Sequence, residues 1–370
     1  MRVAIVGGRL QGVEAAYLAR EAGYESVVVD RDKNAPASSL CDKFVCGDAL
    51  DRAVLREAFE GADAVVPAIE NDAVLESAGL AAKDKGIPFL HDEHSYRISS
   101  SKLESDEMFG EIGVPAPAPW PRCGFPLIAK PSGESGSAGV ALIENRAQLD
   151  EWTRLNGGKP YVLQQYLPGP SYSIEVVGDG ERCGALQVTE LFMDEVHDCC
   201  RVITPSLLAP EADAKFREIS LRIARRLKIR GVFDVEIILH ENECKVLEID
   251  ARLPSQTPTA VYHSSGVNIL ELICRSALDG RLPETGRSRE ESVLYQHIYA
   301  DGRGVSVLGE HVMGACGPLR KHDGFLGADI AITSWSPGAS PWAATLIYLG
   351  GTRETLIERQ RESVLSARGL

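Results

Sequence analysis

The sequence predicts an α/β protein in which a parallel-sheet domain precedes a larger α+β core and a small C-terminal domain. Residues 1–95 alternate short strands with helical stretches, which is typical of a doubly wound parallel sheet. A Pro-rich connector, residues 115–121, then introduces strands joined by turns rich in glycine and proline. The length of 370 residues also exceeds what one ordinary hydrophobic core supports, so we expect two or three domains.

The first domain, residues 1–95, is expected to consist of alternating strands and helices. Its expected strands are Arg2–Val6, Ser26–Asp30, Phe44–Cys46, Ala64–Ala68 and Pro88–Leu90. Its expected helices are Gln11–Ala22, Arg52–Phe59 and Asp72–Lys85.

The second domain, residues 96–290, has a mixed pattern, and a third, residues 291–370, follows it. The expected central strands are Leu127–Lys130, Tyr161–Gln165, Val232–Leu239 and Lys245–Ile249, and the expected helices are Ala212–Leu227 and Ile269–Ala277. Gly280–Glu291 is interpreted as a linker. Short strands and a charged terminal helix, Arg353–Ser366, predict a small α/β domain that serves as a lid or as a homodimer surface.

Charge and composition exclude several classes of function. The net charge of −14 and the pI of about 5.1 argue against a nucleic-acid partner, which requires a basic face, but leave cationic amino acids open as ligands. No apolar stretch approaches the roughly 20 residues that span a bilayer, so no membrane partner is expected. The chain opens directly on a strand, and its nine cysteines contain no Cys-x-x-Cys motif. We therefore expect a cytoplasmic protein with reduced thiols.

A glycine motif, Val6-Gly7-Gly8-Arg9-Leu10-Gln11-Gly12, follows the first strand and opens the first helix. A dinucleotide fingerprint has glycine at its third position, where this chain has Arg9. The side chain obstructs a close approach of pyrophosphate, so a nicotinamide oxidoreductase is not expected. Two interpretations stay open. The glycines make only a tight turn, or the residues at the helix N-terminus contact a small substrate. The second interpretation involves Arg9, Leu10 and Gln11, with Asp30 and Asp48 touching a ribose or an amine.

A second motif places a lysine before a loop of small residues, Lys130-Pro131-Ser132-Gly133-Glu134-Ser135-Gly136-Ser137. Backbone N–H groups of such a loop can close over phosphates, while Lys130 and the upstream Lys102 supply positive charge. The alternative is a flexible surface hairpin. Further on, the extended segment Val162–Gly169 can offer backbone groups to an adenine edge, or can be an edge strand that enters a turn.

The strongest motif consists of two acidic strands joined by a polar hairpin. Alternation along each strand places Asp234 and Glu236 on one face, and Glu248, Asp250 and Arg252 on one face. The short hairpin makes the strands antiparallel neighbours, so the four carboxylates converge. Such a patch repels itself unless cations neutralise it, and Mg²⁺ bound together with phosphate oxygens satisfies this requirement. The alternative is a solvated sheet face.

In this order and spacing, the lysine, the loop, the extended hinge and the Glu-x-Asp-x-Arg strand resemble the ATP-grasp superfamily over residues 96–280. The resemblance implies a ligase that forms a C–N bond, uses ATP with Mg²⁺, and releases ADP and phosphate. It also implies that residues 1–95 form a Rossmann-like domain without a dinucleotide. Two departures concern the nucleotide: Gln164 and Gln165 replace glutamates of the hinge, and Ser171 stands where many members have an acidic ribose contact.

More narrowly, the chain resembles the ligases of pyrrolysine biosynthesis that join 3-methylornithine to lysine. This resemblance rests on Gly7–Gly12, Ser95–Ser99, Asp234–Glu236 and Glu248–Pro258, and the Ser-Gln-Thr-Pro ending of the last segment is absent from generic ATP-grasp enzymes. It implies that the carboxyl group of (3R)-3-methyl-D-ornithine is joined to the ε-amine of L-lysine. Arg9 stands where the family has lysine, which keeps the charge but not the geometry.

The resemblance also implies roles for individual residues. The metal ligands, for two Mg²⁺ ions, are Asp234, Glu248 and Asp250, and the catalytic residues are Arg252, Glu236 and Lys130. The ATP-binding residues are Lys102, Lys130, Ser135, Ser137, Gln164, Gln165, Tyr166 and Leu167, with Arg9, Asp30, Asp48 and Ala49. The ornithine-type substrate is assigned to Ser171, Tyr172, Ser173, Glu236, Arg252, Leu253, Pro254, Ser255, Gln256 and Thr257. Lysine is assigned to Leu10, Gln11 and Glu70.

The expected mechanism is phosphorylation of the substrate carboxylate followed by attack of an amine. The acyl phosphate supplies a good leaving group, and closure of the loop Ser132–Gly139 keeps water away from it. Either Glu236 or Glu70 orients the amine or accepts its proton. The alternative functions are another ATP-grasp ligase, of the D-alanine–D-alanine or carbamoyl-phosphate type, or a non-catalytic sensor of nucleotides or amino acids.

Overall fold

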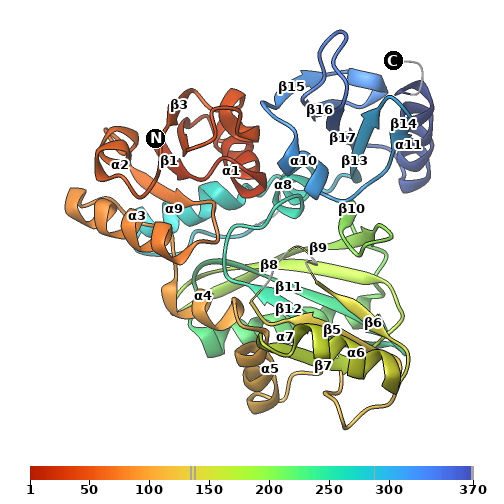
Figure 1. Ribbon diagram of the computed structural model, residues 1–370. Helices are drawn as coiled ribbons and strands as arrows, with labels where there is room; N and C mark the ends of the chain where they lie inside the picture. The colour runs from red at the N-terminus through yellow and green to blue at the C-terminus, as the bar shows by residue number, and fades with distance from the viewer. Residues whose placement is uncertain (134–135, 137–138, 287, 368–370) are drawn as a thin grey trace.

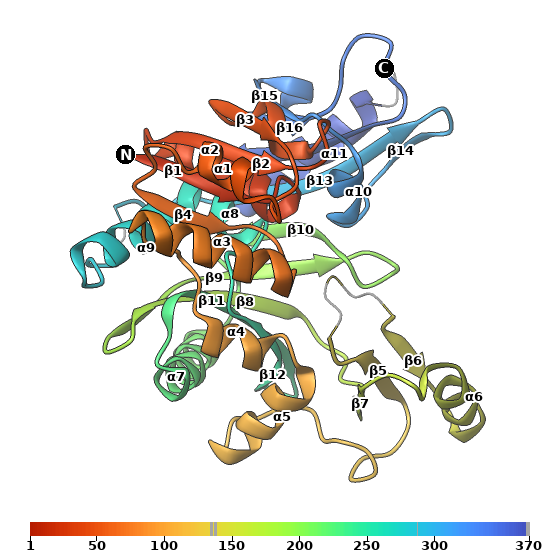
Figure 2. The same ribbon diagram turned by 60° about the vertical axis from the view of Figure 1, so that its left-hand side comes forward.

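The computed structural model describes residues 1–133, 136, 139–286 and 288–367. Figure 1 shows an N-terminal unit in red and orange, a central unit in yellow and green, and a C-terminal unit in blue. In both views the N-terminal and C-terminal units lie beside each other above the strands of the central unit (Figure 2). The two ends of the chain therefore lie on the same side of the central unit.

The N-terminal unit contains the parallel sheet that the sequence predicts. Its strands are β1 (Arg2–Val6), β2 (Glu25–Asp30), β3 (Lys43–Cys46) and β4 (Ala64–Pro67), in the order β3-β2-β1-β4 with parallel pairings. Its helices are α1 (Leu10–Glu21), η1 (Pro36–Ser39), α2 (Arg52–Ala58) and α3 (Asp72–Lys85). The predicted strand Pro88–Leu90 is reduced to an isolated parallel bridge between Phe89 and Val65 before the chain enters the next helix.

The glycine motif forms a very tight turn between β1 and α1. Gly7 has a φ of +108°, and a Cβ atom there would lie 2.3 Å from the carbonyl oxygen of Ala68. A Cβ atom at Gly12 would lie 2.2 Å from the carbonyl oxygen of Gly7. Both approaches require glycine, so the packing of this turn is sufficient to explain two of its three glycines.

The sequence analysis missed two helices that precede the Pro-rich connector. They are α4 (Glu93–Ser99) and α5 (Lys102–Glu111). Each follows a side-chain cap, since Asp92 accepts the Ser95 N–H and Ser101 accepts the Glu104 N–H. A small sheet of order β6-β5-β7 comes next. Its elements are β5 (Leu127–Pro131), β6 (Ala141–Ile143), α6 (Arg146–Asn156) and β7 (Tyr161–Gln165).

The large sheet has the order β12-β11-β8-β9-β10-β13-β17-β16-β15, with β14 paired to β13. Its first strands are β8 (Ser171–Asp179), β9 (Cys183–Met193), β10 (Cys199–Thr204), β11 (Arg230–His240) and β12 (Glu243–Asp250). The helices of this part are α7 (Pro210–Leu227), α8 (Thr257–Ser265) and α9 (Ile269–Asp279). Figure 2 shows the small sheet beyond the β12 end of the large one, and both carry residues that line one cavity.

A two-residue turn joins β11 to β12 and fixes their register. His240 pairs with Glu243, and the intervening Glu241 and Asn242 have φ values of +50° and +65°. Positive φ at both central residues gives a turn whose twist suits a hairpin. The predicted antiparallel pairing of these strands is confirmed.

The C-terminal segment extends the large sheet. Its elements are β13 (Val293–Asp301), β14 (Gly304–Ser306), α10 (His311–Ala315), β15 (Arg320–Asp323), η2 (Phe325–Gly327), β16 (Ile330–Thr333), β17 (Trp342–Leu349) and α11 (Arg353–Ala367). Antiparallel pairing of β13 with β10 carries the sheet from the central unit into this segment. The limits at residues 95 and 290 stay a prediction, and the shared sheet indicates that the last segment is firmly joined to the core.

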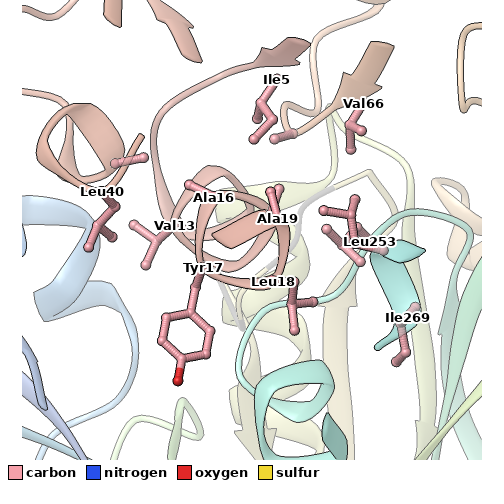
Figure 3. Close-up of a cluster of buried hydrophobic side chains, with 14 of the residues drawn as sticks. Ile5, Val13, Ala16, Tyr17, Leu18, Ala19, Leu40, Val66, Leu253 and Ile269 are labelled. Carbon is pink, nitrogen blue, oxygen red and sulfur yellow. The ribbon is translucent and has the colours of Figure 1, made fainter. Parts of the chain in front are cut away.

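Two hydrophobic clusters cover the two faces of the β8–β12 region. One cluster packs α7 against the face opposite to the acidic residues, and includes Phe216, Phe233 and Ile249. The other cluster joins all three units, and Figure 3 shows Leu253 and Ile269 beside Leu18 of α1. The segment that follows β12 is thus anchored against the N-terminal helix. None of the described helices is long and apolar enough to cross a membrane.

Candidate active site

Four carboxylates meet where β11 and β12 pair. In the antiparallel register, Asp234 lies opposite Asp250 and Glu236 lies opposite Glu248. Directly paired residues project from the same face of a sheet, so the convergence predicted from the sequence is confirmed. The next strand adds to this face, because Glu175 of β8 lies opposite Asp234.

The carboxylates destabilise one another's charged forms. Burial, and then the facing Asp250 carboxylate, raises the pKa of Asp234 well above its usual range. Burial, and then the charge of Glu248, raises the pKa of Glu236 to about 8. Burial also raises the pKa of Asp250 to about 7, although Arg252 lowers it. The charged forms of these carboxylates are therefore disfavoured unless a cation lies among them.

This set of oxygen atoms fits Mg²⁺. The ion takes hard oxygen ligands, and a patch of close carboxylates becomes stable when a divalent charge is shared among them. Asp234 Oδ1 is buried and has no hydrogen-bond partner among the described residues, as expected for an atom reserved for a ligand. Asp234, Glu248 and Asp250 therefore suit the role that the sequence predicts for them.

Arg252 balances part of this negative charge. Its guanidinium lies 3.0 Å from Asp250 and 2.7 Å from Glu70, the latter on the loop after β4. Gln11 donates to the same Glu70 carboxylate at 2.7 Å. Arg252, which is predicted to contact the ornithine-type substrate, therefore lies beside Glu70 and near Gln11, which are predicted to contact lysine. These contacts cross the boundary between the central and N-terminal units.

A cavity of about 920 Å³ lies between the small sheet and the acidic end of the large sheet. It is lined by Lys102, Lys130, Gln164, Gln165, Tyr166, Leu167, Ser171, Glu236 and Glu248 among others. Lys102 Nζ lies 3.5 Å from Glu248, which places one predicted phosphate-binding charge beside a predicted metal ligand. The predicted hinge and lysines therefore share one site. Ser135 and Ser137 lie outside the described residues.

A second cavity, of about 650 Å³, lies on the other side of the carboxylates. It shares Glu236 and Glu248 with the first, and it is also lined by Ser173, Asp234, Asp250, Arg252, Pro254, Ser255, Gln256 and Thr257. Most residues predicted for the ornithine-type substrate therefore line one space. The two cavities therefore meet at the carboxylates of Glu236 and Glu248.

Two of the predicted substrate residues point elsewhere. Tyr172 packs in the cluster beneath the sheet, because side chains alternate along β8 and only its neighbours Ser171 and Ser173 face the cavities. Leu253 packs against α1 (Figure 3). Side-chain contacts with the substrate are therefore not available to these two residues, which support the site from behind.

Four residues predicted for ATP lie at the N-terminal sheet instead of in the first cavity. They lie at the carboxyl ends of β1, β2 and β3, where Asp30 is the last residue of β2 and the other three, Arg9, Asp48 and Ala49, follow β1 or β3. The Asp30 carboxylate accepts the Gly8 N–H at 2.7 Å and so caps the glycine turn. Their contact with a nucleotide stays a prediction.

The structure adds acidic residues that the sequence analysis missed. Asp106 lies one turn after Lys102 on α5, and burial raises its pKa to about 6 against the opposing charges of Lys130 and Lys102. The Lys102–Asp106 spacing, four residues apart on a helix, was the available signal. Glu175 is the next residue after Ser171 and Ser173 on the same face of β8, because side chains alternate along a strand. Glu310 enters the second cavity from the C-terminal segment, and no local pattern indicated it.

Comparison with known proteins identifies the family of this chain. A family model described as an ATP-grasp domain matches residues 99–256. A 3-methyl-D-ornithine–L-lysine ligase of Methanosarcina acetivorans is 34% identical over 98% of this chain and 96% of its own length. The corresponding ligase of Methanosarcina barkeri is 37% identical over 84% of this chain and 83% of its own length. The chain belongs to the 3-methyl-D-ornithine–L-lysine ligase family. The ATP-grasp resemblance and the narrower one read from the sequence are both confirmed.

The fold of this ligase family member agrees with solved ATP-grasp structures. An N5-carboxyaminoimidazole ribonucleotide synthetase in complex with ADP superposes with a TM-score of 0.75 at 15% identity, covering 100% of this chain and 98% of that one. A biotin carboxylase of Campylobacter jejuni superposes with a TM-score of 0.76 at 16% identity, covering 99% of this chain and 91% of that one. These similarities confirm the predicted fold class.

Proposed function

We propose that this chain is an ATP-dependent ligase that joins the carboxylate of (3R)-3-methyl-D-ornithine to the ε-amine of L-lysine. The observation that carries the proposal is the row of four carboxylates at the junction of two cavities. One cavity has lysines and an extended hinge suited to a nucleotide, and the other has the Ser255–Thr257 segment. The names of the relatives supply the two amino acids.

Phosphoryl transfer would take place across the shared carboxylates. A carboxylate oxygen of the ornithine-type substrate attacks the γ-phosphorus of ATP, the bond to ADP breaks, and an acyl phosphate forms. Mg²⁺, held by Asp234, Glu248 and Asp250, would supply a positive charge that offsets the charge on the phosphate oxygens. We propose two ions, as four carboxylates on one patch provide more charge than one ion balances. Lys130 and Lys102 orient the phosphate groups.

Amide formation requires a neutral amine. The lysine ε-amine, whose pKa is ordinarily near 10.4, must lose a proton before it attacks the acyl carbon and releases phosphate. Glu70 is held by Arg252 and Gln11 at the side of the site where lysine is proposed to bind. Glu236 lines both cavities, and burial raises its pKa to about 8, which suits a group that exchanges protons near neutral pH. Either carboxylate can orient the amine or accept its proton.

The experiment that tests this function is mass spectrometry of products formed from ATP, Mg²⁺, L-lysine and D-ornithine. The expected product is the ornithyl-lysine amide with one ADP per amide. Hydroxylamine in place of lysine should trap the acyl phosphate as a hydroxamate. ADP release without the amide, or a preference for D-alanine or bicarbonate over ornithine in the same assay, would overturn the proposed substrates. Absence of ADP release with every amino acid would indicate a sensor.

We further propose a cytoplasmic location and a homodimer. The acidic composition and the nine cysteines, all of which are free, support the first proposal. Light scattering at several protein concentrations tests the second, and a constant mass of one chain would overturn it.

A further inference from the structure

Glu310 is an acidic residue of the substrate cavity that comes from the C-terminal segment. It stands immediately before α10 and lines the same cavity as Arg252 and Gln256. The C-terminal segment thus contributes a side chain to a cavity that residues of the central unit also line.

The position of Glu310 is fixed on both sides. The Gly309 N–H donates to Asp194 Oδ2 at 2.9 Å, and the His311 N–H donates to Asp198 Oδ2 at 3.1 Å. Both aspartates belong to the loop between β9 and β10. Two backbone anchors on the neighbours of one residue hold its side chain in a defined direction, as expected for a binding residue.

The carboxylate of Glu310 is held by neutral donors. Ser255 Oγ donates to Glu310 Oε2 at 2.5 Å, and Gln256 Nε2 donates to the same atom at 2.9 Å. Burial raises the pKa of Glu310, and these hydrogen bonds oppose the shift. Neutral donors orient a carboxylate without cancelling its charge, so Glu310 keeps the capacity to pair with a cation.

The other acidic residues of this cavity have different partners. Asp250 pairs with Arg252, and it forms the proposed metal patch together with the other carboxylates of β11 and β12. Asp198 pairs with His311. An ornithine-type substrate brings one carboxylate, which must reach the metal patch, and two ammonium groups, which need anionic acceptors in a partly buried space.

We propose that Glu310, oriented by Ser255 and Gln256, binds an ammonium group of the ornithine-type substrate. This inference rests on the proposed function and assigns the C-terminal segment a direct part in substrate recognition. The lysine substrate is proposed to bind near Glu70, on the other side of Arg252. Glu310 therefore contacts the ornithine-type substrate and not the lysine substrate.

The test compares Glu310→Gln with the wild-type chain in the amide assay. We expect the KM for D-ornithine to rise about tenfold or more, while the KM values for L-lysine and ATP change less than about twofold. Glu310→Asp keeps the charge and should recover part of the loss. Glu354→Gln, an exposed residue at the start of α11, is the matched control and should leave all three KM values unchanged.

Substrate analogues make the result specific. D-norvaline lacks the δ-amine, and 5-aminopentanoate lacks the α-amine. The preference of the wild-type chain for ornithine over each analogue therefore measures how much the missing ammonium group contributes to recognition. Glu310→Gln should lose most of the preference over one of them. Unchanged preference over both, or a rise confined to the KM for lysine, would overturn the inference. A wild-type chain that forms no amide from ornithine would instead overturn the proposed function, and the inference with it.

Discussion

Asp234 and Asp250 lie directly opposite each other on β11 and β12, and their mutual repulsion adds to the effect of burial in raising the pKa of Asp234. Two carboxylates in this relationship favour either a proton or a metal ion between them. The pair therefore links the stability of the protein to the cation that its chemistry requires.

Replacing one member of this pair should stabilise the metal-free protein and at the same time lower the activity. In Asp234→Asn we expect the melting temperature of the metal-free protein to rise by about 1–2 °C for each kcal/mol of repulsion removed. Mg²⁺ with ATP should stabilise this variant less than the wild-type chain, and kcat should fall about 100-fold or more. Thermal melts with and without Mg²⁺ and ATP provide the measurement. Asp150→Asn, on an exposed side chain of α6, should change none of these quantities, and a full Mg²⁺ response in Asp234→Asn would contradict the metal site.

Removing a lysine from the nucleotide cavity should weaken ATP binding selectively. Lys130 lines the cavity and lowers the pKa of both Glu236 and Asp106 through its charge. In Lys130→Met we expect the KM for ATP to rise about tenfold or more, with little change in the KM values of the amino acids. Lys215→Met, on exposed α7, serves as the control in the same steady-state assay. An unchanged KM for ATP would show that Lys130 does not bind the phosphate groups of ATP.

A buried glutamate of α1 should make stability depend on pH. Glu14 is 2% exposed and accepts the N–H groups of Thr259 and Gln256, so it joins α1 to the start of α8. Burial raises the pKa of Glu14 to about 7. The folded chain therefore retains a proton that the unfolded chain releases above its ordinary pKa of 4.5, and stability from this group falls as the pH rises toward 7.

The variant Glu14→Gln has no such titration. Relative to wild type, its free energy of unfolding should increase by about 3 kcal/mol between pH 4.5 and pH 8, on top of a pH-independent loss of hydrogen bonding. Denaturant unfolding at several pH values measures this difference. A difference that stays constant over the whole range would show that folding does not raise the pKa of Glu14.

Adding one methyl group to the glycine turn should destabilise the N-terminal unit. In Gly12→Ala the new Cβ atom would approach the carbonyl oxygen of Gly7 to 2.2 Å, so α1 must shift away from β1. We expect a loss of about 3 kcal/mol in the free energy of unfolding. Gly23→Ala is the contrasting case, because open space surrounds its Cβ position although its φ of +69° adds backbone strain. Denaturation midpoints of both variants give the comparison, and equal small losses would show that the turn tolerates a side chain.

The sequence by itself determined the acidic patch. Alternation along two strands and a short polar hairpin fix which side chains share a face, because both features are local. The lysine before its loop and the Ser255–Thr257 segment were also readable as motifs. The helices α4 and α5 were missed, although Asp92 and Ser101 supply ordinary N-caps, because few apolar residues mark their period.

Only the tertiary structure decided which distant residues complete the site. Glu175 and Glu310 come from different segments, and their approach to the carboxylates or to the second cavity depends on how β8, β11 and β13 pack in the large sheet. The resemblance named Glu70, but its contact with Arg252 depends on how the N-terminal unit packs against the central unit. Tyr172 shows the converse, since its motif pointed to the substrate while the pleat of β8 turned its side chain into the core. Local sequence sets the face of a strand, but contacts between separate segments depend on packing, which is non-local and leaves no periodic signal.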